Sequence, residues 1–525
     1  MTVIDKTKLT RRTFLAGTGA AAVLTLGYAV LPEGMSAAQA ATDNMFSPSM
    51  FYEIHGDGRV VVHIAKAEMG QHVGTALAQM VAEELECSWD NVELNYIGYD
   101  PKFGLVLTGG SWSMNWSFDA MSRAGASGRK ILIEAAVAKF GGAATEYSAS
   151  DGVITGNGHT ITYGELVTAG VEPRVMTEAE VAGLTLKTAD QRKLVGKSMP
   201  AMDIPAKVRG TAGYGIDVDI EGMVYATPAT PPVRYGASVN AVDDSAAKDI
   251  PGYMQHVVIN DPTGSQTGWV MAIADSYFTA KKAADALKID YDLGGNTGVS
   301  LEGILTENAR LIDSGDGARL VMNDGDVEAA FSGSGKMHEA TYSTGLNIHM
   351  PLEPMNATVE VIDGVYHIHA GNQFQTLVMG LVPAALGIEP TQVVFHQQYL
   401  GGGFGRRLDC DYIVMACLTA RDVGKPVKMI YSREADTQFD FTRPAATVRM
   451  RACTAAPGAG GGGGWARERA SGWGLDGGRL GWGADGPFCN LVSIICETGY
   501  EPGTASARRR GQLRTYVHGR NGLCC

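Results

Sequence analysis

Apolar residues along the chain alternate between two periods, and this alternation predicts strands followed by helices. Residues 59–65 (RVVVHIA) form a β-rich run, and residues 91–97 fit a second short strand. After the polar loop 68–71 (EMGQ), apolar residues recur at helical spacing: Val73, Leu77, Met80, Val81 and Leu85. A second polar loop, 108–113 (TGGSWS), leads into a helix expected over about 118–140. Both loops precede helices, where unpaired backbone amides and the helix dipole favour anions.

The pattern changes further along the chain. Two β runs around the turn GNGH predict a hairpin over 153–163. From about 200 to 295, short β segments punctuated by Gly and Pro predict a separate, mainly β domain. Residues 296–340 are polar and rich in Gly and Asp, which predicts a linker with short elements. Strand patterns then resume at 358–362, 365–370 and 393–400.

Composition narrows the class of protein. The 525 residues are 45% hydrophobic and 19% charged, which is typical of a globular protein and excludes disordered, collagen-like and multi-pass membrane proteins. This length predicts about three or four domains. With 56 acidic and 43 basic residues the formal charge is −13, so the chain repels phosphate backbones and no nucleic acid partner is expected.

The cysteines exclude the common metal motifs and also distinguish the last 73 residues. None of the eight cysteines forms a CxxC pair or the spacing of a plant-type iron–sulfur site, so no metal ligands of the chain's own are expected. Five of them lie in residues 453–525, together with three of the seven Trp and 18 of the 68 Gly. This aberrant segment is either a natural low-complexity tail or the product of a shifted reading frame, and we favour the frameshift.

Residues 1–40 predict an export signal. Arg11 and Arg12 are followed by x-Phe-Leu, an Ala/Gly/Leu stretch and the small-residue site 38–40 (AQA). The arginine pair resembles the twin-arginine signal, which exports folded proteins. We expect cleavage after Ala40 rather than a membrane anchor, because an apolar run of about 18 residues is at the lower limit for spanning. The expected location is the periplasm, with a cofactor inserted before export.

A glycine-rich loop, 401–407 (GGGFGRR), follows a strand-like run and precedes a predicted helix. The dinucleotide fingerprint GxGxxG fails because Arg406 stands at its last glycine. A Walker A motif at 196–198 (GKS) fails because Gln191 stands at its first glycine. By its residues alone, the loop is either a turn or a pocket for a phosphate-bearing ligand.

With 346–358 (LNIHMPLEPMNAT) and 370–373 (AGNQ), this loop resembles the molybdopterin-binding subunit of the xanthine oxidase family of molybdenum hydroxylases. The early position of EMGQ resembles the branch that contains the isoquinoline 1-oxidoreductase beta subunit, and 208–217 (VRGTAGYGID) resembles the hammerhead domain. The resemblance covers about 50–451. It implies an α+β fold with an inserted α/β hammerhead domain. The implied order is signal peptide 1–40, molybdopterin-binding segment 41–195, hammerhead 200–295, linker 296–340 and molybdopterin-binding segment 341–452, before the tail 453–525.

The resemblance also implies a cofactor and the residues that contact it. The cofactor is molybdenum–molybdopterin in the cytosine dinucleotide form, in which the pterin and not the protein holds the metal. Gln373 matches the glutamine that hydrogen-bonds the apical oxo group of molybdenum. The loop residues Gly402, Gly403, Phe404 and Gly405 match the segment whose amides approach the cofactor, since only glycine lets a backbone come so close.

Three polar residues match positions near the pterin and its phosphates: Gln71, Ser111 and Ser113. The alternative for the two serines is capping of the following helix. His72 stands where the family has a glycine, so the local turn is expected to differ.

The charged residues of the second segment have separate expectations. Arg406 and its neighbour Arg407 are expected to meet phosphate or pterin, or else to form a solvated surface pair. Glu353, in a proline-flanked turn, resembles a structural element and not a catalytic base.

The catalytic base itself is not identified. The family places a glutamate after a glycine near the C-terminus, and none of Glu468, Glu497 and Glu501 follows a glycine. The implied partners are a small subunit with two [2Fe-2S] clusters, a cytochrome acceptor and a small N-heteroaromatic or aldehyde substrate that is hydroxylated with oxygen from water. The alternative is a truncated, inactive chain that keeps part of the cofactor cleft.

Overall fold

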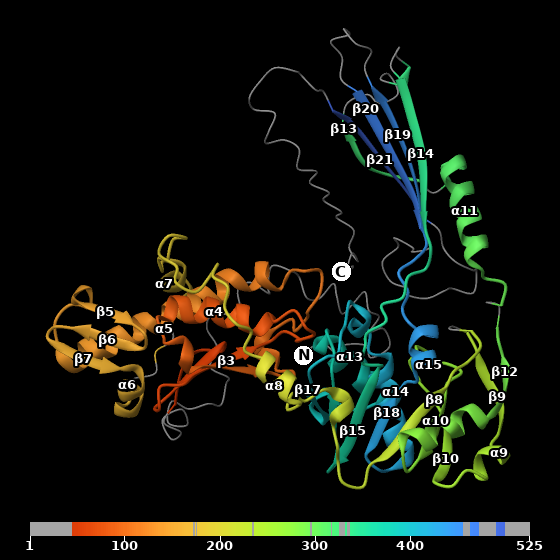
Figure 1. Ribbon diagram of the computed structural model, residues 1–525, viewed down its shortest axis with the longest axis horizontal. Coiled ribbons are helices and arrows are strands. Elements are labelled where there is room, and N and C mark those ends of the chain that lie inside the picture. Colours follow the sequence, from red (N-terminus) through yellow and green to blue (C-terminus); the bar gives the residue numbers. More distant parts are fainter. Residues whose placement is uncertain are drawn as a thin grey trace, which may run out of the picture.

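The structure is a computed structural model of the 525-residue chain. It describes residues 45–171, 174, 176–233, 236–294, 297–316, 318–324, 331–332, 336–454, 463–471 and 490–498. The predicted signal peptide, 1–40, lies outside the described residues, as does most of 453–525. In Figure 1 two units lie side by side along the long axis, and a third sheet rises from the second unit.

The first unit is a four-stranded sheet covered by two helices. Its strands run in the order β1 (Met45–Ser49), β2 (Tyr52–His55), β3 (Val60–Ile64) and β4 (Val92–Tyr96). Strands β3 and β4 are parallel, so the helix α4 (Val73–Leu85) crosses between them. Strand, helix and strand therefore lie where the periodicity of 59–97 predicts them.

The helix α5 (Ser113–Phe140) packs closely on α4 through small residues. A side chain at Gly125 would stand 2.4 Å from the Val81 carbonyl oxygen, and one at Gly128 would stand 1.9 Å from the Tyr52 hydroxyl. The helix begins about five residues before the predicted start, because the polar residues of its first turn carry no apolar periodicity.

A small sheet and short helices complete this unit. The predicted hairpin over 153–163 is confirmed, with one further strand added. The elements are β5 (Tyr147–Ser150), β6 (Val153–Gly156), β7 (His159–Thr162), α6 (Tyr163–Ala169), α7 (Glu178–Ala182) and α8 (Ile204–Arg209).

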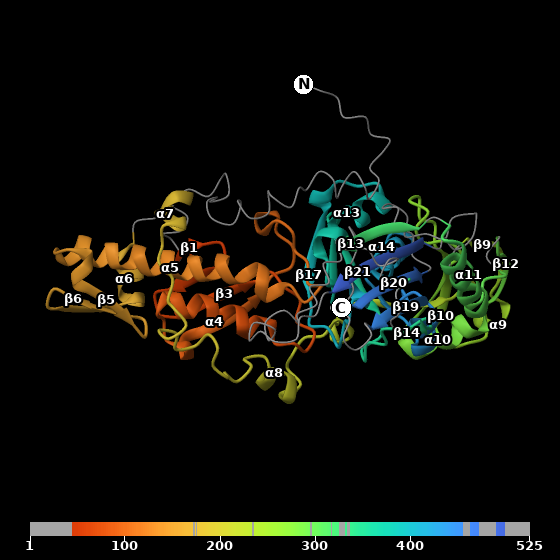
Figure 2. The same ribbon diagram turned by 90° about the horizontal axis from the view of Figure 1, so that it is seen from above.

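The second unit contains a seven-stranded mixed sheet, seen at the lower right of Figure 1. Its order is β10 (Tyr253–Val258), β11 (Val270–Ala274), β8 (Val224–Ala229), β18 (Val427–Ile430), β15 (Asn356–Ile362), β16 (Val365–Ala370) and β17 (Val393–Gln397). The helices of this region are α9 (Ser245–Lys248), α10 (Tyr277–Ala286), α13 (Gln375–Leu386), α14 (Asp411–Val423) and α15 (Arg433–Gln438). Seen from above in Figure 2, α13 and β17 lie on the side facing the first unit.

This sheet crosses the boundary predicted near residue 295. Strands β8, β10 and β11 come from the segment 200–295, and they extend the sheet formed by 356–430 through parallel pairing of β8 with β18. Among the described residues of 200–295, only β9 (Ser238–Asp243) and β12 (Lys288–Asp292) pair in a sheet apart from this one. The local sequence pattern does not predict this continuous sheet, because the pairing of β8 with β18 joins residues about 200 positions apart.

The segment 296–340, predicted as a linker, contains a 14-residue helix, α11 (Leu301–Ser314). Ser300 caps its first turn and Gly315 ends it with a φ of 70°. The helix packs against a five-stranded sheet of order β13 (Arg319–Asp324), β21 (Asn490–Thr498), β20 (Gly463–Ser471), β19 (Ala446–Thr454) and β14 (Lys336–Thr344). Two of these strands come from 453–525. No helix in the described part of the chain is long and apolar enough to span a bilayer.

Short 3-10 helices occupy several connections: η1 (Trp89–Asn91), η2 (Pro101–Phe103), η3 (Ala144–Glu146), η4 (Gly215–Asp217), η5 (Pro390–Gln392) and η6 (Arg406–Leu408). Separate apolar cores lie within the two units. The predicted site residues fall where these units meet.

Candidate functional site

Three loops that are distant in sequence meet between the two units. We call them the Glu68 turn (68–73), the Ser111 loop (108–113) and the glycine loop (401–407). The Ala67 amide donates to the Thr108 hydroxyl at 2.8 Å, and the Leu400 amide donates to the Glu68 carbonyl at 3.0 Å. These bonds join each loop to its neighbour, so the structure brings together the segments in which Gln71, Ser111 and Gly403 were singled out.

Gln373 joins the Ser111 loop to the glycine loop. Its side-chain amide donates to the Thr108 carbonyl at 2.9 Å, and its side-chain oxygen accepts from the Gly405 amide at 3.1 Å. The residue is 1% exposed. Both ends of the carboxamide therefore hold loop backbone in place, and the contact with a molybdenum oxo group stays a prediction.

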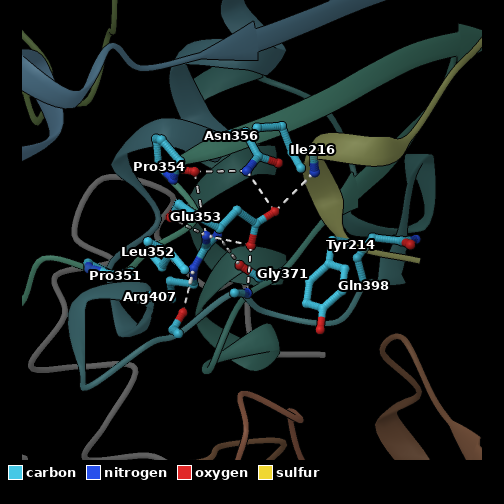
Figure 3. Close-up of polar contacts among 12 residues, drawn as sticks. Tyr214, Ile216, Pro351, Leu352, Glu353, Pro354, Asn356, Gly371, Gln398 and Arg407 are labelled. Atoms are coloured by element: carbon cyan, nitrogen blue, oxygen red, sulfur yellow. Dashed lines mark hydrogen bonds and ion pairs between the residues drawn. The ribbon is translucent and has the colours of Figure 1, made fainter. Parts of the chain in front are cut away.

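The glycine loop is held from beneath by Arg407 and Glu353, drawn in Figure 3. The buried Arg407 guanidinium donates to the carbonyls of Gly402, Gly371 and Glu353 at 3.0 to 3.2 Å and pairs with the Glu353 carboxylate at 2.8 Å. That carboxylate also accepts from the amides of Gly401 and Ile216 and from the Asn356 side chain, at 2.8 to 3.0 Å. Glu353 is thus a structural anchor, as its proline-flanked turn predicts.

This anchoring leaves backbone donors available on the glycine loop. The amides of Gly401 and Gly405 are engaged by Glu353 and Gln373. The amides of Gly402, Gly403 and Phe404 donate to no group within the described residues. Gly402, Phe404 and Gly405 have φ values of 99°, 54° and 101°, and successive amides in such turns form anion-binding concavities. Phe404 as a whole residue is 57% exposed.

The space around Gly403 leaves little room for a side chain. A side chain there would stand 2.6 Å from the Gln373 side-chain oxygen and 2.7 Å from the Met69 sulfur. The glycine thus permits close contact between the loops, and approach of the cofactor to Gly403 stays a prediction.

The Ser111 loop supplies a second group of donors. Ser111 has a φ of 57°, and α5 begins at Ser113 after the N-cap Trp112, whose side chain makes no capping hydrogen bond. The capping alternative for the two serines is therefore wrong, because neither serine occupies the N-cap position. No acidic residue lies in the first turn, so its amides and the positive end of the helix dipole remain available to an anion.

Lys66 adds a cation beside this loop. Its ammonium donates to the Leu107 carbonyl at 2.8 Å and lies 5.8 Å from the centre of the Trp116 ring. No carboxylate among the described residues lies within 4.0 Å of it, and burial lowers the pKa of Lys66 to about 8. Sequence analysis missed this residue, since a single lysine after a strand carries no motif.

The Glu68 turn is organised by its own carboxylate. Glu68 accepts from the amides of Gly70, His72 and Val73 at 2.8, 3.2 and 3.0 Å. His72 has φ 57° and ψ 37°, the left-handed conformation that glycine favours, and a difference between this turn and that of the family stays a prediction. The Gln71 side chain folds back on its own loop, accepting from the Met69 amide at 2.8 Å and donating to the Ala67 carbonyl at 2.9 Å.

A charge cluster lies behind this turn. Ligand-type atoms of Glu68, His72 and Asp203 lie within 4.8 Å of one another. The Lys207 ammonium donates to Glu68 at 3.1 Å and also to Asp203, so it supplies the positive charge that a metal ion would bring. Burial alone would raise the pKa of Asp203, but Lys207 and His72 hold that pKa below its usual value. Asp203 and Lys207 escaped sequence analysis because they lie about 130 residues beyond the turn they contact.

The Arg406 side chain is buried among acidic residues. Its guanidinium is 0% exposed and pairs with both oxygens of Asp411 at 2.9 Å, with Asp440 at 3.3 Å. Burial alone would lower the pKa of Arg406, but Asp411 raises it above its ordinary value. Both predictions for this residue, a phosphate contact and a solvated surface pair, are therefore wrong.

Known proteins identify the ligand class of such a site. Two family models described as molybdopterin cofactor-binding domain match residues 5–223 and 313–459. The chain is 40% identical over 411 residues to a membrane-bound aldehyde dehydrogenase [pyrroloquinoline-quinone] of Gluconacetobacter polyoxogenes, covering 78% of this chain and 53% of that protein. It is 30% identical over 497 residues to the beta subunit of isoquinoline 1-oxidoreductase of Brevundimonas diminuta, covering 86% and 62%.

The chain belongs to the xanthine oxidase family of molybdopterin-binding subunits. It spans about half to three fifths of the length of these two relatives. Among solved structures, the aldehyde oxidoreductase of Desulfovibrio desulfuricans matches with a TM-score of 0.42 and 19% identity, covering 73% of this chain and 43% of that one. The two family models and the two relatives confirm the family resemblance seen in the motifs.

Proposed function

We propose that this chain is the cofactor-binding subunit of a molybdenum hydroxylase that oxidises an N-heteroaromatic compound or an aldehyde with oxygen from water. The convergence of the three loops carries the proposal. It brings the amides of Gly402, Gly403 and Phe404, which are unpaired within the described residues, to the same junction of loops as the uncapped start of α5. Donors of this kind bind the phosphates and electron-rich groups of a large cofactor.

The residues present fit such a cofactor. The amides of Gly402, Gly403 and Phe404 would receive it on one side, and the Ser111 loop with Ser113 would receive its phosphates on the other. Gln373 and Gln71 keep the loop backbones in register. When bound, the cofactor supplies the two-electron oxidation of the substrate, while the chain binds and orients it.

No base for the reaction is assigned among the buried carboxylates of the site. Glu68 and Glu353 each accept at least four hydrogen bonds or ion pairs from loop amides and cationic or amide side chains. Carboxylates engaged in this way hold structure and are not positioned to accept a substrate proton.

The order of segments supports the isoquinoline-like arrangement. The match at 5–223 precedes the match at 313–459, and 224–312 lies between them. We propose that this interval contains most of the inserted hammerhead domain, and that the two flanking segments form the permuted molybdopterin-binding domain.

Export and partners complete the proposal. We propose export by the Arg11-Arg12 signal, with cleavage after Ala40 and a periplasmic location. Since the sequence has no motif for an iron–sulfur cluster, a small subunit with two [2Fe-2S] clusters would carry electrons to a cytochrome. The relatives named as subunits of isoquinoline 1-oxidoreductase and of nicotinate dehydrogenase support assembly with partner chains.

The test is to purify the full chain with its small subunit from cells supplied with molybdate, and to identify the released cofactor by mass spectrometry. We expect about one molybdenum and about four iron atoms per complex, with the cytosine dinucleotide form of the pterin. Chain purified from molybdate-free cells is the control. A folded complex that carries pyrroloquinoline quinone and no molybdenum would instead support the function named for the 40% identical relative. Activity on aldehydes and on N-heteroaromatics then decides the substrate class.

A further inference from the structure

The Glu68 turn depends on a lysine from another segment of the chain. The Glu68 carboxylate is 1% exposed and gathers the amides of Gly70, His72 and Val73. Its counter-ion is Lys207, on the short helix α8, whose ammonium lies 3.1 Å from the Glu68 oxygen Oε1. The amides of the turn are therefore bound by a carboxylate of the same turn, whereas the charge of that carboxylate is balanced by a residue on α8.

Lys207 also contacts the other side of the cleft. Its ammonium lies 5.4 Å from the centre of the Tyr399 ring, and Tyr399 directly precedes the Leu400 amide that donates to the Glu68 carbonyl. The Tyr96 hydroxyl lies 3.5 Å from the second Glu68 oxygen, and its ring packs edge-on against Tyr399. One ammonium thus touches the anchor of the Glu68 turn and the residue that leads into the glycine loop.

The charges explain why the lysine is needed. Glu68 and Asp203 are both buried, and the ammonium donates to both. Two buried carboxylates without a cation between them would repel each other and bear an uncompensated cost of desolvation. His72 contributes a ring nitrogen 2.9 Å from Asp203, but its side chain is 39% exposed, and it is the His72 backbone amide, not the ring, that hydrogen-bonds Glu68. Burial alone would lower the pKa of Lys207, yet Asp203 and Glu68 raise it, so the ammonium stays protonated at neutral pH.

We propose that Lys207 is a positioning residue of the cofactor cleft: by neutralising Glu68 and Asp203 together, it holds the Glu68 turn against the Ser111 and glycine loops. The consequence for cofactor occupancy rests on the proposed function, whereas the consequence for the turn does not. The segment that leads into the predicted hammerhead thereby controls the geometry of the cleft.

The experiment compares amide hydrogen exchange, by mass spectrometry, in the full chain and in Lys207→Met, Lys207→Arg and Lys248→Met. Lys248 is the matched control, because it forms an exposed pair with Asp244 on α9. In Lys207→Met we expect peptides covering 68–73 to exchange at least about tenfold faster, with α4 peptides covering 77–85 unchanged. The reason is that Glu68 would keep a buried charge without its cation, which destabilises the turn that this carboxylate holds. Lys207→Arg and Lys248→Met should match the wild type.

A double variant guards against a Lys207→Met chain that folds poorly. Asp203→Asn removes one of the two acids, so Lys207→Met with Asp203→Asn should recover part of the protection of 68–73. Equal acceleration of the turn and of α4, or full protection of the turn without Lys207, would overturn the proposal.

Molybdenum per folded chain separates this inference from the proposed function. We expect Lys207→Met to hold less than half the molybdenum of Lys207→Arg. If the wild-type complex holds none, the proposed function fails, and the exchange rates still decide the role of Lys207.

Discussion

The Glu68 turn and the glycine loop are held by buried anchors of opposite charge. In the first, one carboxylate collects the amides of Gly70, His72 and Val73. In the second, the Arg407 guanidinium collects three carbonyls. The anchor thus influences which backbone groups remain for a ligand: these three amides of the turn are already bound, whereas the glycine loop retains the amides of Gly402, Gly403 and Phe404 within the described residues.

The two anchors also differ in where their counter-ions come from. Arg407 pairs with Glu353, and both lie in the 353–407 region whose strands share one sheet. Glu68 pairs with Lys207, which lies on α8 beyond the first unit's sheets. We therefore expect the glycine loop to unfold with its sheet, and the Glu68 turn to open separately.

The largest expected effect is loss of the arginine anchor. Arg407→Met removes the guanidinium and leaves the Glu353 carboxylate buried without its cation, which costs about 3 to 5 kcal/mol. The free energy of unfolding in urea measures this. Arg421→Met is the control, because Arg421 pairs with Asp422 at the surface, and it should cost less than about 1 kcal/mol. A cost that small for Arg407 would show that the loop does not need its anchor.

Substitutions of two glycines distinguish a requirement for space at one position from a requirement for positive φ at the other. Gly403→Val forces a side chain against Gln373 and Met69, and overpacking of this kind costs about 1 to 3 kcal/mol. Gly70→Ala meets nothing within 4 Å but keeps a φ of 108°, so it should cost about 1 kcal/mol from strain alone. Melting temperatures rank the two. A larger loss at Gly70 would reverse our account of the two loops.

Lys66 is a partly buried cation that pairs with no carboxylate among the described residues, so its contribution to stability depends on pH. Its pKa of about 8 lies below the ordinary value of 10.5, so between these pH values the unfolded chain binds more protons. The contribution of this group to the free energy of unfolding therefore rises from about pH 8 to 10.5. Lys66→Met should flatten that rise in urea titrations, whereas Lys248→Met should preserve it. An unchanged slope in Lys66→Met would assign the pH dependence elsewhere.

The smallest effect is expected at His72. His72→Gly relieves a left-handed residue but loses the contact with Asp203, and these changes oppose each other. We expect a net change in unfolding free energy within about 1 kcal/mol, because each contribution is of that size. A loss of several kcal/mol would show that His72 shares the role of Lys207.

Local patterns predicted the elements around the site. The strand β3, the helix α4 and the hairpin of β6 and β7 follow from periodicity and turn residues, because neighbours within about ten positions determine them. The glycine loop was located between a strand and a helix, and Glu353 was assigned a structural role, both from local context. Motifs also identified the family, which the matched domains confirm.

The features that the sequence did not predict involve contacts between residues that are distant along the chain. The sheet that joins β8 to β18, the pairing of Arg406 with Asp440, and the contact of Lys207 with the Glu68 turn all depend on contacts that form only on folding. Residue type alone made Arg406 and Arg407 equal candidates for a ligand, since a guanidinium binds a phosphate as well as a carboxylate. By itself the sequence determined the loops, the glycines and the family, because these depend on local conformation and motif. Only the tertiary structure decided which charged side chains are buried in ion pairs that support the loops of the cleft. Burial and pairing depend on which other segments of the chain contact each residue.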